Sequence, residues 1–131
     1  MTRHDAREQA FLVMFEKIFD DELTVSEIIE KNEEGDLIKL NGFAKTLLKI
    51  CEENSAAVDE IISQYCKDWS LSRLPKVSLA VLRLSVAEIK FYGETPVGVA
   101  VNEAVEIAKK YGTPEDSSYI NGVLGSVVKA V

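Results

Sequence analysis

The residues that could do chemistry are few in this chain, and their spacing favours structural roles. Glu103 and Glu106 stand three residues apart in the segment NEAVE, so a helix would place both carboxylates on one face. Such a pair could serve as an acid and a base or bind a metal ion, but we expect no histidine or third carboxylate to converge on it. Cys51 and Cys66 lie 15 positions apart, which favours two small core residues over a metal site or a redox pair. We therefore expect no catalytic residue, no metal site and no cofactor.

Other patterns exclude further classes of protein. The sequence has one histidine, His4, no glycine-rich phosphate loop and no GxSxG nucleophile motif. No apolar run approaches the roughly 18 residues that a membrane-spanning helix needs. The start MTRHDAREQ lacks the apolar stretch of a signal peptide. We expect a cytoplasmic protein without enzymatic activity and without a membrane partner.

Charge is distributed unevenly along the chain, whose net charge is −7. Residues 16–36 hold nine acidic side chains against two lysines, which alone gives −7. Residues 67–90 hold five basic side chains against two acidic ones, a local charge of +3. Net charge therefore does not exclude a nucleic-acid partner. If one binds, we expect the acidic segment to lie away from it, because the segment would repel phosphates within a Debye length of about 8 Å.

The elements that must position these residues are helices nearly everywhere. Apolar residues recur at helical spacing over about 3–19, 25–31, 40–51 and 58–65. Residues 76–90 are apolar almost all round, which predicts the central helix of a bundle. The pattern favours one all-α domain over residues 1–131, with about seven helices.

Helix ends are marked by capping residues and prolines. Asn54 or Ser55 can cap the fourth helix with a side-chain oxygen. Pro75 and Pro96 are expected in the first turns of the next two helices, where a proline loses no intrahelical hydrogen bond, with Thr95 as a cap.

The basic residues of the predicted central helix recur every seven positions, at Lys76, Arg83 and Lys90, and so form one stripe. We favour a solvated helix edge over a binding role for this stripe.

The segment YINGVLGSVV at 119–128 permits two structures that exclude each other. Asn-Gly between apolar residues is typical of a tight hairpin turn, but the apolar residues here recur with a period near 3.6. Thr113, Pro114 and the acids after them form a complete helix start, so we expect a helix through Gly122. Because glycine inside a helix costs about 1 kcal/mol relative to alanine, we expect Gly122 to allow close approach of a neighbouring helix.

Four segments together resemble one known family. PVGVAVNEAVEIAKKYG (96–112) followed by SSYINGVLG (117–125) is similar to the signature of the NusB family of bacterial transcription antitermination factors. VLRLSVAEI (81–89) and AREQAFLVMFE (6–16) resemble the family's central and first helices. The motifs stand in the family's order and spacing, at both ends of the chain and at its centre. Residues 20–66 add only length and helical pattern.

The resemblance implies a fold of two packed helical bundles, no enzymatic activity and two direct partners. Family members bind single-stranded boxA RNA, especially in ribosomal RNA leaders, together with the ribosomal protein NusE. Through that complex they act with other Nus factors and RNA polymerase. A homodimer that hides the RNA surface is also compatible with the sequence.

The resemblance also implies which residues contact RNA. The arginine-rich start of the first helix corresponds to Arg3 and Arg7, and Phe15 stands at a usual tyrosine. The central helix contributes Arg83. The acidic residue and the aromatic before Asn-Gly correspond to Asp116 and Tyr119. Tyr119 could equally be a core residue, because most aromatics at helical spacing serve in packing.

Departures from the family pattern lower the expected RNA affinity. Relatives often carry a run of arginines where this chain reads RHDAR, and Ser118 replaces a common lysine. Because fewer cations release fewer counterions, this chain alone should bind RNA more weakly. The alternative is a helical protein-interaction module with little RNA affinity of its own. The accessory domain of an RNA methyltransferase is disfavoured, because the sequence ends at Val131 without a catalytic domain.

Overall fold

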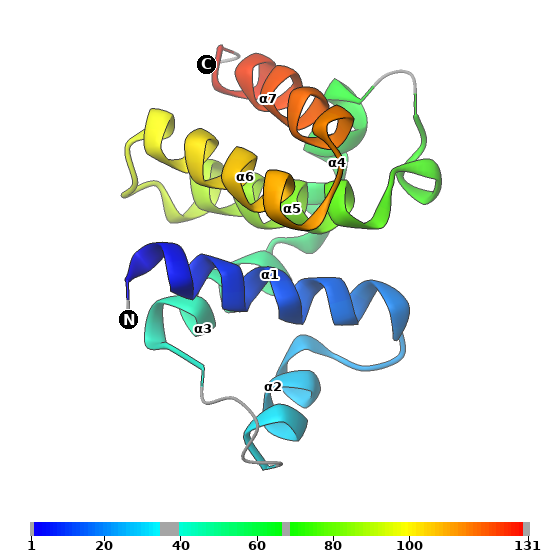
Figure 1. The fold of residues 1–131 in the computed structure, drawn as a ribbon. Helices are drawn as coiled ribbons and strands as arrows, with labels where there is room; N and C mark the ends of the chain where they lie inside the picture. The colour runs from blue at the N-terminus through cyan, green and yellow to red at the C-terminus, as the bar shows by residue number, and fades with distance from the viewer. Residues whose placement is uncertain (1, 35–39, 67–68, 130–131) are drawn as a thin grey trace.

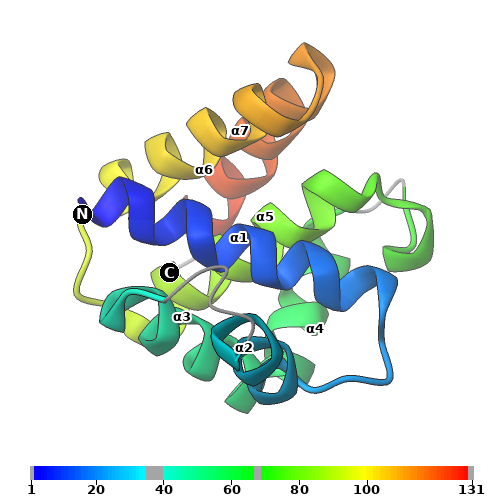
Figure 2. The same ribbon diagram turned by 60° about the horizontal axis from the view of Figure 1, so that its bottom comes forward.

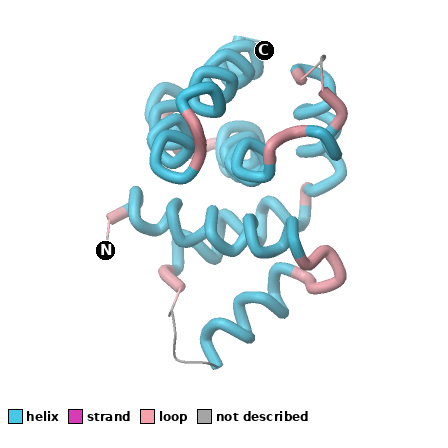
Figure 3. The backbone as a smooth tube through the Cα atoms, turned by 45° about the vertical axis from the view of Figure 1, so that its right-hand side comes forward, coloured by secondary structure: helices cyan, strands magenta, loops and turns pink. Residues whose placement is uncertain are grey.

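The structure is a computed structural model that describes residues 2–34, 40–66 and 69–129. Within these ranges the chain folds into helices joined by loops, without a strand (Figure 3). The elements, in order, are α1 (Arg3–Phe19), α2 (Val25–Glu34), α3 (Gly42–Glu53), α4 (Ser55–Tyr65), the 3-10 turn η1 (Leu71–Arg73), α5 (Lys76–Ala87), the π-helical turn η2 (Glu88–Tyr92), α6 (Val97–Tyr111) and α7 (Pro114–Lys129). The predicted all-α fold with seven α-helices is confirmed.

The helices form two packed bundles (Figure 1). α1, α2 and α3 make the first bundle, and α4 to α7 make the second, which lies above α1 in this view. Figure 2 brings α2 toward the viewer, below α1 and beside α3, both of which it contacts. α5 packs against α1, α3, α4, α6 and α7, and nine of its twelve residues are buried. The prediction of a central helix is therefore confirmed, and α5 carries most of the contact between the bundles.

One continuous apolar core joins the two bundles. It includes Phe11 on α1, Leu48 on α3, Leu82 on α5 and Leu124 on α7, each at most 1% exposed. Burying a side chain of this size stabilises the fold by roughly 1.5–3 kcal/mol. Cys51 and Cys66 are free and buried in the same core, as their spacing predicts.

Two helix starts carry the complete capping arrangement. Thr2 accepts from the backbone N–H of Asp5, and Asp5 accepts from the backbone N–H of Thr2, at the start of α1. Thr113 and Asp116 form the same reciprocal pair at the start of α7, with distances of 3.1 and 2.8 Å. The predicted start of α7 is confirmed.

Three other predicted helix starts are wrong in detail. Asn54 precedes α4, but its side chain donates to the carbonyl oxygen of Ile50 in α3 rather than capping α4. Pro75 and Pro96 occupy the cap position itself, where their carbonyl oxygens accept the first helical bonds, so they precede the first turn. Thr95 donates its hydroxyl to Glu88 instead of capping α6. For Asn54 and Thr95, a partner outside the helix that follows competes for the side-chain polar group.

Residues 119–128 lie within α7, so the helix is confirmed and the hairpin is excluded. Ile120, Val123, Leu124 and Val127 form its buried face. The predicted close approach at Gly122 is wrong: the residue is exposed, and a Cβ atom built there would meet nothing within 4 Å. The helical period of the apolar residues is confirmed, but Gly122 lies outside the buried face of α7.

A glycine at a close helix contact would make any larger residue destabilising, whereas the exposure of Gly122 predicts that alanine is stabilising there. Gly122→Ala should stabilise the protein by up to about 1 kcal/mol, because alanine has the higher helix propensity and open space surrounds the position. Thermal unfolding should show a midpoint raised by a few degrees.

Gly112→Ala is the matched control for this prediction. A Cβ at Gly112 would lie 2.6 Å from Oδ2 of Asp116, the atom that accepts from the backbone of Thr113 at the start of α7. This variant should melt lower, since displacing a cap costs about 0.5–2 kcal/mol. A lower midpoint for Gly122→Ala would show that the helix is locally strained or contacted at that position.

Candidate nucleic-acid interface

Arg7 lies at the centre of a buried polar network between the bundles. It is 7% exposed, and its guanidinium donates to both carboxylate oxygens of Glu88, at 3.0, 3.1 and 2.7 Å. Glu88 is 3% exposed and also accepts from the hydroxyl of Thr95 at 2.7 Å. Burial disfavours the charged guanidinium, but the bonds to Glu88 outweigh it and raise the pKa of Arg7. These hydrogen bonds make Arg7 a link between α1 and η2. Contact between Arg7 and RNA stays a prediction.

Arg3 lies one turn earlier on α1, in different surroundings. The side chain is exposed, with Cζ 3.9 Å from the centre of the Phe43 ring and Nη1 donating to the hydroxyl of Tyr92 at 3.2 Å. Phe43 and Tyr92 meet edge to face, with ring centres 5.5 Å apart. Arg7 approaches the same Phe43 ring at 5.2 Å. Arg3 and Arg7 are therefore brought together at the start of α1, as the sequence predicts.

Phe15 belongs to a row of aromatic rings along α1. Its ring centre lies 5.6 Å from that of Phe11 and 4.9 Å from that of Phe19. Phe11 in turn lies 4.9 Å from Tyr111 of α6. Phe11 is buried, Phe15 is partly buried and Phe19 is 65% exposed. The row runs from the interior between the bundles to the surface at the end of α1.

Arg83 lines a cleft of about 420 Å³ that also borders Met14 and Lys17 of α1. Its guanidinium binds Asp59 of α4 in two parallel hydrogen bonds, at 3.0 and 3.1 Å. The Arg83 side chain is 24% exposed. The sequence predicts a basic stripe here, but at Arg83 the charge is paired within the protein. Contact between Arg83 and RNA stays a prediction.

Asp116 and Tyr119 lie near the start of α7. Asp116 is the capping residue described above, and its second carboxylate oxygen accepts from Ser78 of α5 at 3.0 Å. Tyr119 is partly buried against the core and forms a side-chain hydrogen bond with Cys66. The packing role that the sequence left open for Tyr119 is present, and its stacking on a base stays a prediction.

Ionic contacts fix α1 on α6 beside these residues. His4 binds Glu103, and Glu8 binds both Lys110 and Tyr111. The hydrogen bond to Glu103 raises the pKa of His4, and the bonds from Lys110 and Tyr111 lower the pKa of Glu8. Together these contacts hold the first turns of α1 against the second bundle.

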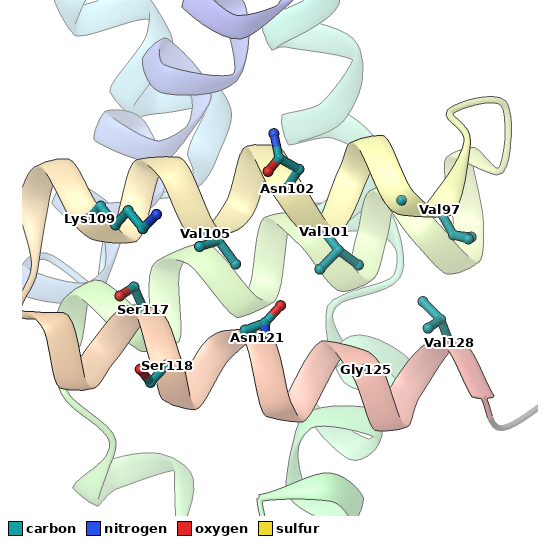
Figure 4. A pocket seen from close by; sticks show the side chains of 11 residues that line it. Val97, Val101, Asn102, Val105, Lys109, Ser117, Ser118, Asn121, Gly125 and Val128 are labelled. Atoms are coloured by element: carbon teal, nitrogen blue, oxygen red, sulfur yellow. The ribbon is translucent and has the colours of Figure 1, made fainter.

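A groove of about 570 Å³ runs between α6 and α7 (Figure 4). Val101 and Val105 of α6 face Asn121 of α7 across it, and Lys109 lies toward one end. Asn121 is exposed, so the Asn-Gly pair forms part of a surface rather than of a helix contact.

Glu103, Glu106 and the two cysteines, which were weighed above as catalytic or metal-binding residues, are accounted for by their contacts and burial in the fold. The expectation that no histidine would meet this pair is wrong, because His4 binds Glu103. Glu106 lies 3.6 Å from Lys109. Burial raises the pKa of the Cys51 thiol to about 12, so this sulfur remains protonated and weakly nucleophilic. Among the described residues no group of three potential ligands could hold a metal ion. No helix in the described part of the chain is long and apolar enough to cross a membrane.

The six predicted contact residues are held by different partners within the protein. Arg3 and Arg7 share Phe43, whereas Phe15, Arg83, Asp116 and Tyr119 each contact different residues. Sequence reasoning missed Glu88, Phe43 and Tyr92. Glu88 had a usable signal: it is the one carboxylate in the apolar segment 76–90, and a buried carboxylate requires a partner.

Comparison with solved structures places this fold in a known class. The complex described as antitermination factors NusB and NusE with dsRNA contains a chain that matches with a TM-score of 0.86 at 29% identity, covering 100% of both chains. The NusB protein of T. maritima matches with a TM-score of 0.87 at 31% identity, covering 99% of this chain and 92% of that one. The two-bundle fold therefore defines an all-α protein of the antitermination-factor class.

Sequence comparison identifies the family. The model of the NusB family matches residues 4–129. The transcription antitermination protein NusB of Natranaerobius thermophilus is 36% identical, over 97% of this chain and 94% of the relative. The same protein of Thermoanaerobacter sp. is 37% identical, over 98% and 91%. The chain belongs to the NusB family, and the resemblance found in its four motifs is confirmed.

Proposed function

We propose that this protein is a transcription antitermination subunit that binds boxA-type single-stranded RNA together with the ribosomal protein NusE. The family match over residues 4–129 carries this proposal. The full-length likeness to a NusB chain solved with NusE and dsRNA supports both kinds of partner. In this proposal the protein acts in the cytoplasm on ribosomal RNA transcription, through other Nus factors and RNA polymerase, and without enzymatic activity.

The proposed RNA surface comprises the residues that carry the family resemblance, Arg3, Arg7, Phe15, Arg83, Asp116 and Tyr119. Their geometry divides them by role. Arg3 is exposed and contacts aromatic rings, so it offers a direct cationic contact. Arg7 and Arg83 are bound to carboxylates, so their charges are partly neutralised within the protein. Phe15 and Tyr119 supply partly buried aromatic edges.

A second candidate function follows from the pairing of Arg7 and Arg83. An all-α module that binds a protein partner but has little RNA affinity would need few free cations. A homodimer through the RNA surface is a related possibility within this candidate. Both candidates predict the protein complex, and RNA binding separates them.

The discriminating experiment measures RNA binding by the protein and NusE, singly and together. Fluorescence anisotropy of a labelled boxA RNA should show weak binding to this protein alone, with a shallow salt dependence, because few cations release few counterions. Adding NusE should tighten binding at least about tenfold and make it selective over a scrambled RNA, since a second surface adds contacts worth about 1.4 kcal/mol or more.

Variants test whether Arg83 lies on the RNA surface. Arg83→Gln should weaken the boxA complex and reduce the salt slope by about 0.7, the value for one phosphate contact on a single strand. Arg73→Gln, which removes an exposed arginine on η1, is the matched control and should change neither the boxA affinity nor the salt slope.

The binding measurements also decide between the two candidate functions. If this protein and NusE associate but bind boxA no better than the scrambled RNA, the protein is an interaction module and not an antitermination subunit.

A further inference from the structure

The guanidinium of Arg3 is held differently from those of Arg7 and Arg83. Arg7 and Arg83 each bind a carboxylate in several hydrogen bonds. Arg3 instead lies over the Phe43 ring, at 3.9 Å from its centre, and donates to the Tyr92 hydroxyl at 3.2 Å. Its positive charge is therefore positioned by aromatic side chains and is not neutralised by the contacts that position it.

The rings that hold Arg3 are themselves fixed by the fold. Phe43 packs against the core near the start of α3, and its ring meets that of Tyr92 edge to face. Tyr92 is the last residue of η2, and Gly93 follows it with a φ of 70°, a conformation that other residues rarely adopt. Behind them the bond between Arg7 and Glu88 ties α1 to the same turn. Three elements, α1, α3 and η2, thus fix the position of one exposed guanidinium.

A planar cation with one face on a ring has a definite binding chemistry. Phe43 covers one face of the guanidinium, and because Arg3 is exposed, the opposite face is accessible to solvent. Unpaired RNA bases stack on arginine planes as well as on aromatic rings. Fixing the side chain in advance reduces the rotamer entropy that is lost when a ligand binds.

We propose that Arg3, Phe43 and Tyr92 form a subsite for one unpaired RNA nucleotide, whose base stacks on the open face of the Arg3 guanidinium. Phe43 and Tyr92 act as positioning residues: Phe43 fixes the plane, and Tyr92 fixes its rotation. This subsite rests on the proposed RNA-binding function, but it requires only a single strand and not the boxA sequence.

Three substitutions test the subsite in the complex with NusE, using boxA RNA and a scrambled RNA of equal length. Arg3→Lys keeps the charge but removes the plane, and should weaken binding about five- to tenfold with an unchanged salt slope, within the range measured for loss of one stacked base. Phe43→Leu keeps an apolar contact and should weaken binding similarly. Arg73→Lys is the matched control and should bind as the unaltered protein does.

The double variant Arg3→Lys with Phe43→Leu separates positioning from general loss of structure. If Phe43 acts through Arg3, the double variant should bind no more weakly than Arg3→Lys alone. Tyr92→Phe should weaken binding less than Phe43→Leu, because it removes only the hydroxyl. Thermal unfolding of each variant reports its stability separately.

RNAs with one base removed at each position in turn identify the stacked nucleotide. One abasic position should weaken binding to the unaltered protein and leave binding to Arg3→Lys unchanged. The subsite is wrong if Arg3→Lys binds RNA as tightly as the Arg73→Lys control does. It is also wrong if each abasic RNA loses the same affinity for the unaltered protein as for Arg3→Lys.

Equal binding of boxA and scrambled RNA, with both weakened by Arg3→Lys, would overturn the boxA function and leave the subsite standing. Absence of binding to either RNA would overturn both.

Discussion

Glu88→Ala should destabilise the protein by about 3–5 kcal/mol, because it leaves the buried guanidinium of Arg7 without its partner. The Arg7 side chain is 9% exposed, so water cannot replace the lost carboxylate without opening the contact between α1 and η2. The substitution also leaves the Thr95 hydroxyl without its acceptor. Since domains of this size have a total stability of about 5–15 kcal/mol, the variant should lose a large part of it. Urea unfolding followed by circular dichroism measures the loss.

A double variant shows that the unpaired charge causes this loss. Arg7→Met with Glu88→Met removes both charges and keeps apolar volume, so it should be more stable than Glu88→Ala by about 2 kcal/mol or more. Glu88→Gln, which keeps the shape and hydrogen-bonding capacity, should lie between the two. A loss below about 1 kcal/mol for Glu88→Ala would mean that Arg7 turns outward to solvent. Arg7 would then be available to RNA, as the sequence first suggests.

The helices were predictable because each has a local signal. The period of apolar residues located α1, α3, α4 and α7, and the nearly uniform apolar character of residues 76–90 identified α5 as the central helix. The cap at Thr113 decided between a helix and a hairpin at Asn121-Gly122, because its bonds are made within four residues. The bounds of α2 were less predictable. The acidic residue Asp36, part of the segment expected to lie away from RNA, is outside the described residues, and that expectation stays a prediction.

Features that depend on tertiary partners were not predictable. Thr95 was expected to cap α6, but Glu88 of the preceding turn accepts its hydroxyl. Gly122 was assigned to a helix contact because glycine is unfavourable in helices, yet its side of α7 is exposed. Helix propensity gives the free-energy cost of placing glycine in a helix, but it does not tell which neighbouring element, if any, that position faces.

The candidate site was predicted residue by residue through family resemblance, but its electrostatics were not. The sequence identified Arg7 and Arg83 as positive charges, and only the fold pairs them with Glu88 and Asp59. These partners are 81 and 24 positions away in sequence. Arg3 differs because its guanidinium lies over an aromatic ring, without a carboxylate partner among the described residues, and only the fold brings Phe43 of α3 against it. Pairing over such distances has no local sequence pattern.

Phe11→Ala should destabilise the protein by about 3–5 kcal/mol, the usual cost of removing a fully buried phenylalanine. Phe11 is 1% exposed, and its ring contacts Phe15 on α1 and Tyr111 on α6, so it belongs to the contact between the two bundles. Phe11→Leu retains most of the volume and should cost about 1.5 kcal/mol or less. Phe19→Ala removes the same ring from a position that is 65% exposed and should change stability by at most about 0.5 kcal/mol.

The shape of the unfolding transition tests whether this contact makes the bundles cooperative. Because α5 and Phe11 join both bundles through one core, Phe11→Ala should shift a single transition to lower urea without splitting it. Far-ultraviolet circular dichroism reports all the helices, and fluorescence of the single tryptophan, Trp69, reports the segment between α4 and α5. Coincident transitions by both probes are expected. Separate transitions would show that the bundles unfold independently.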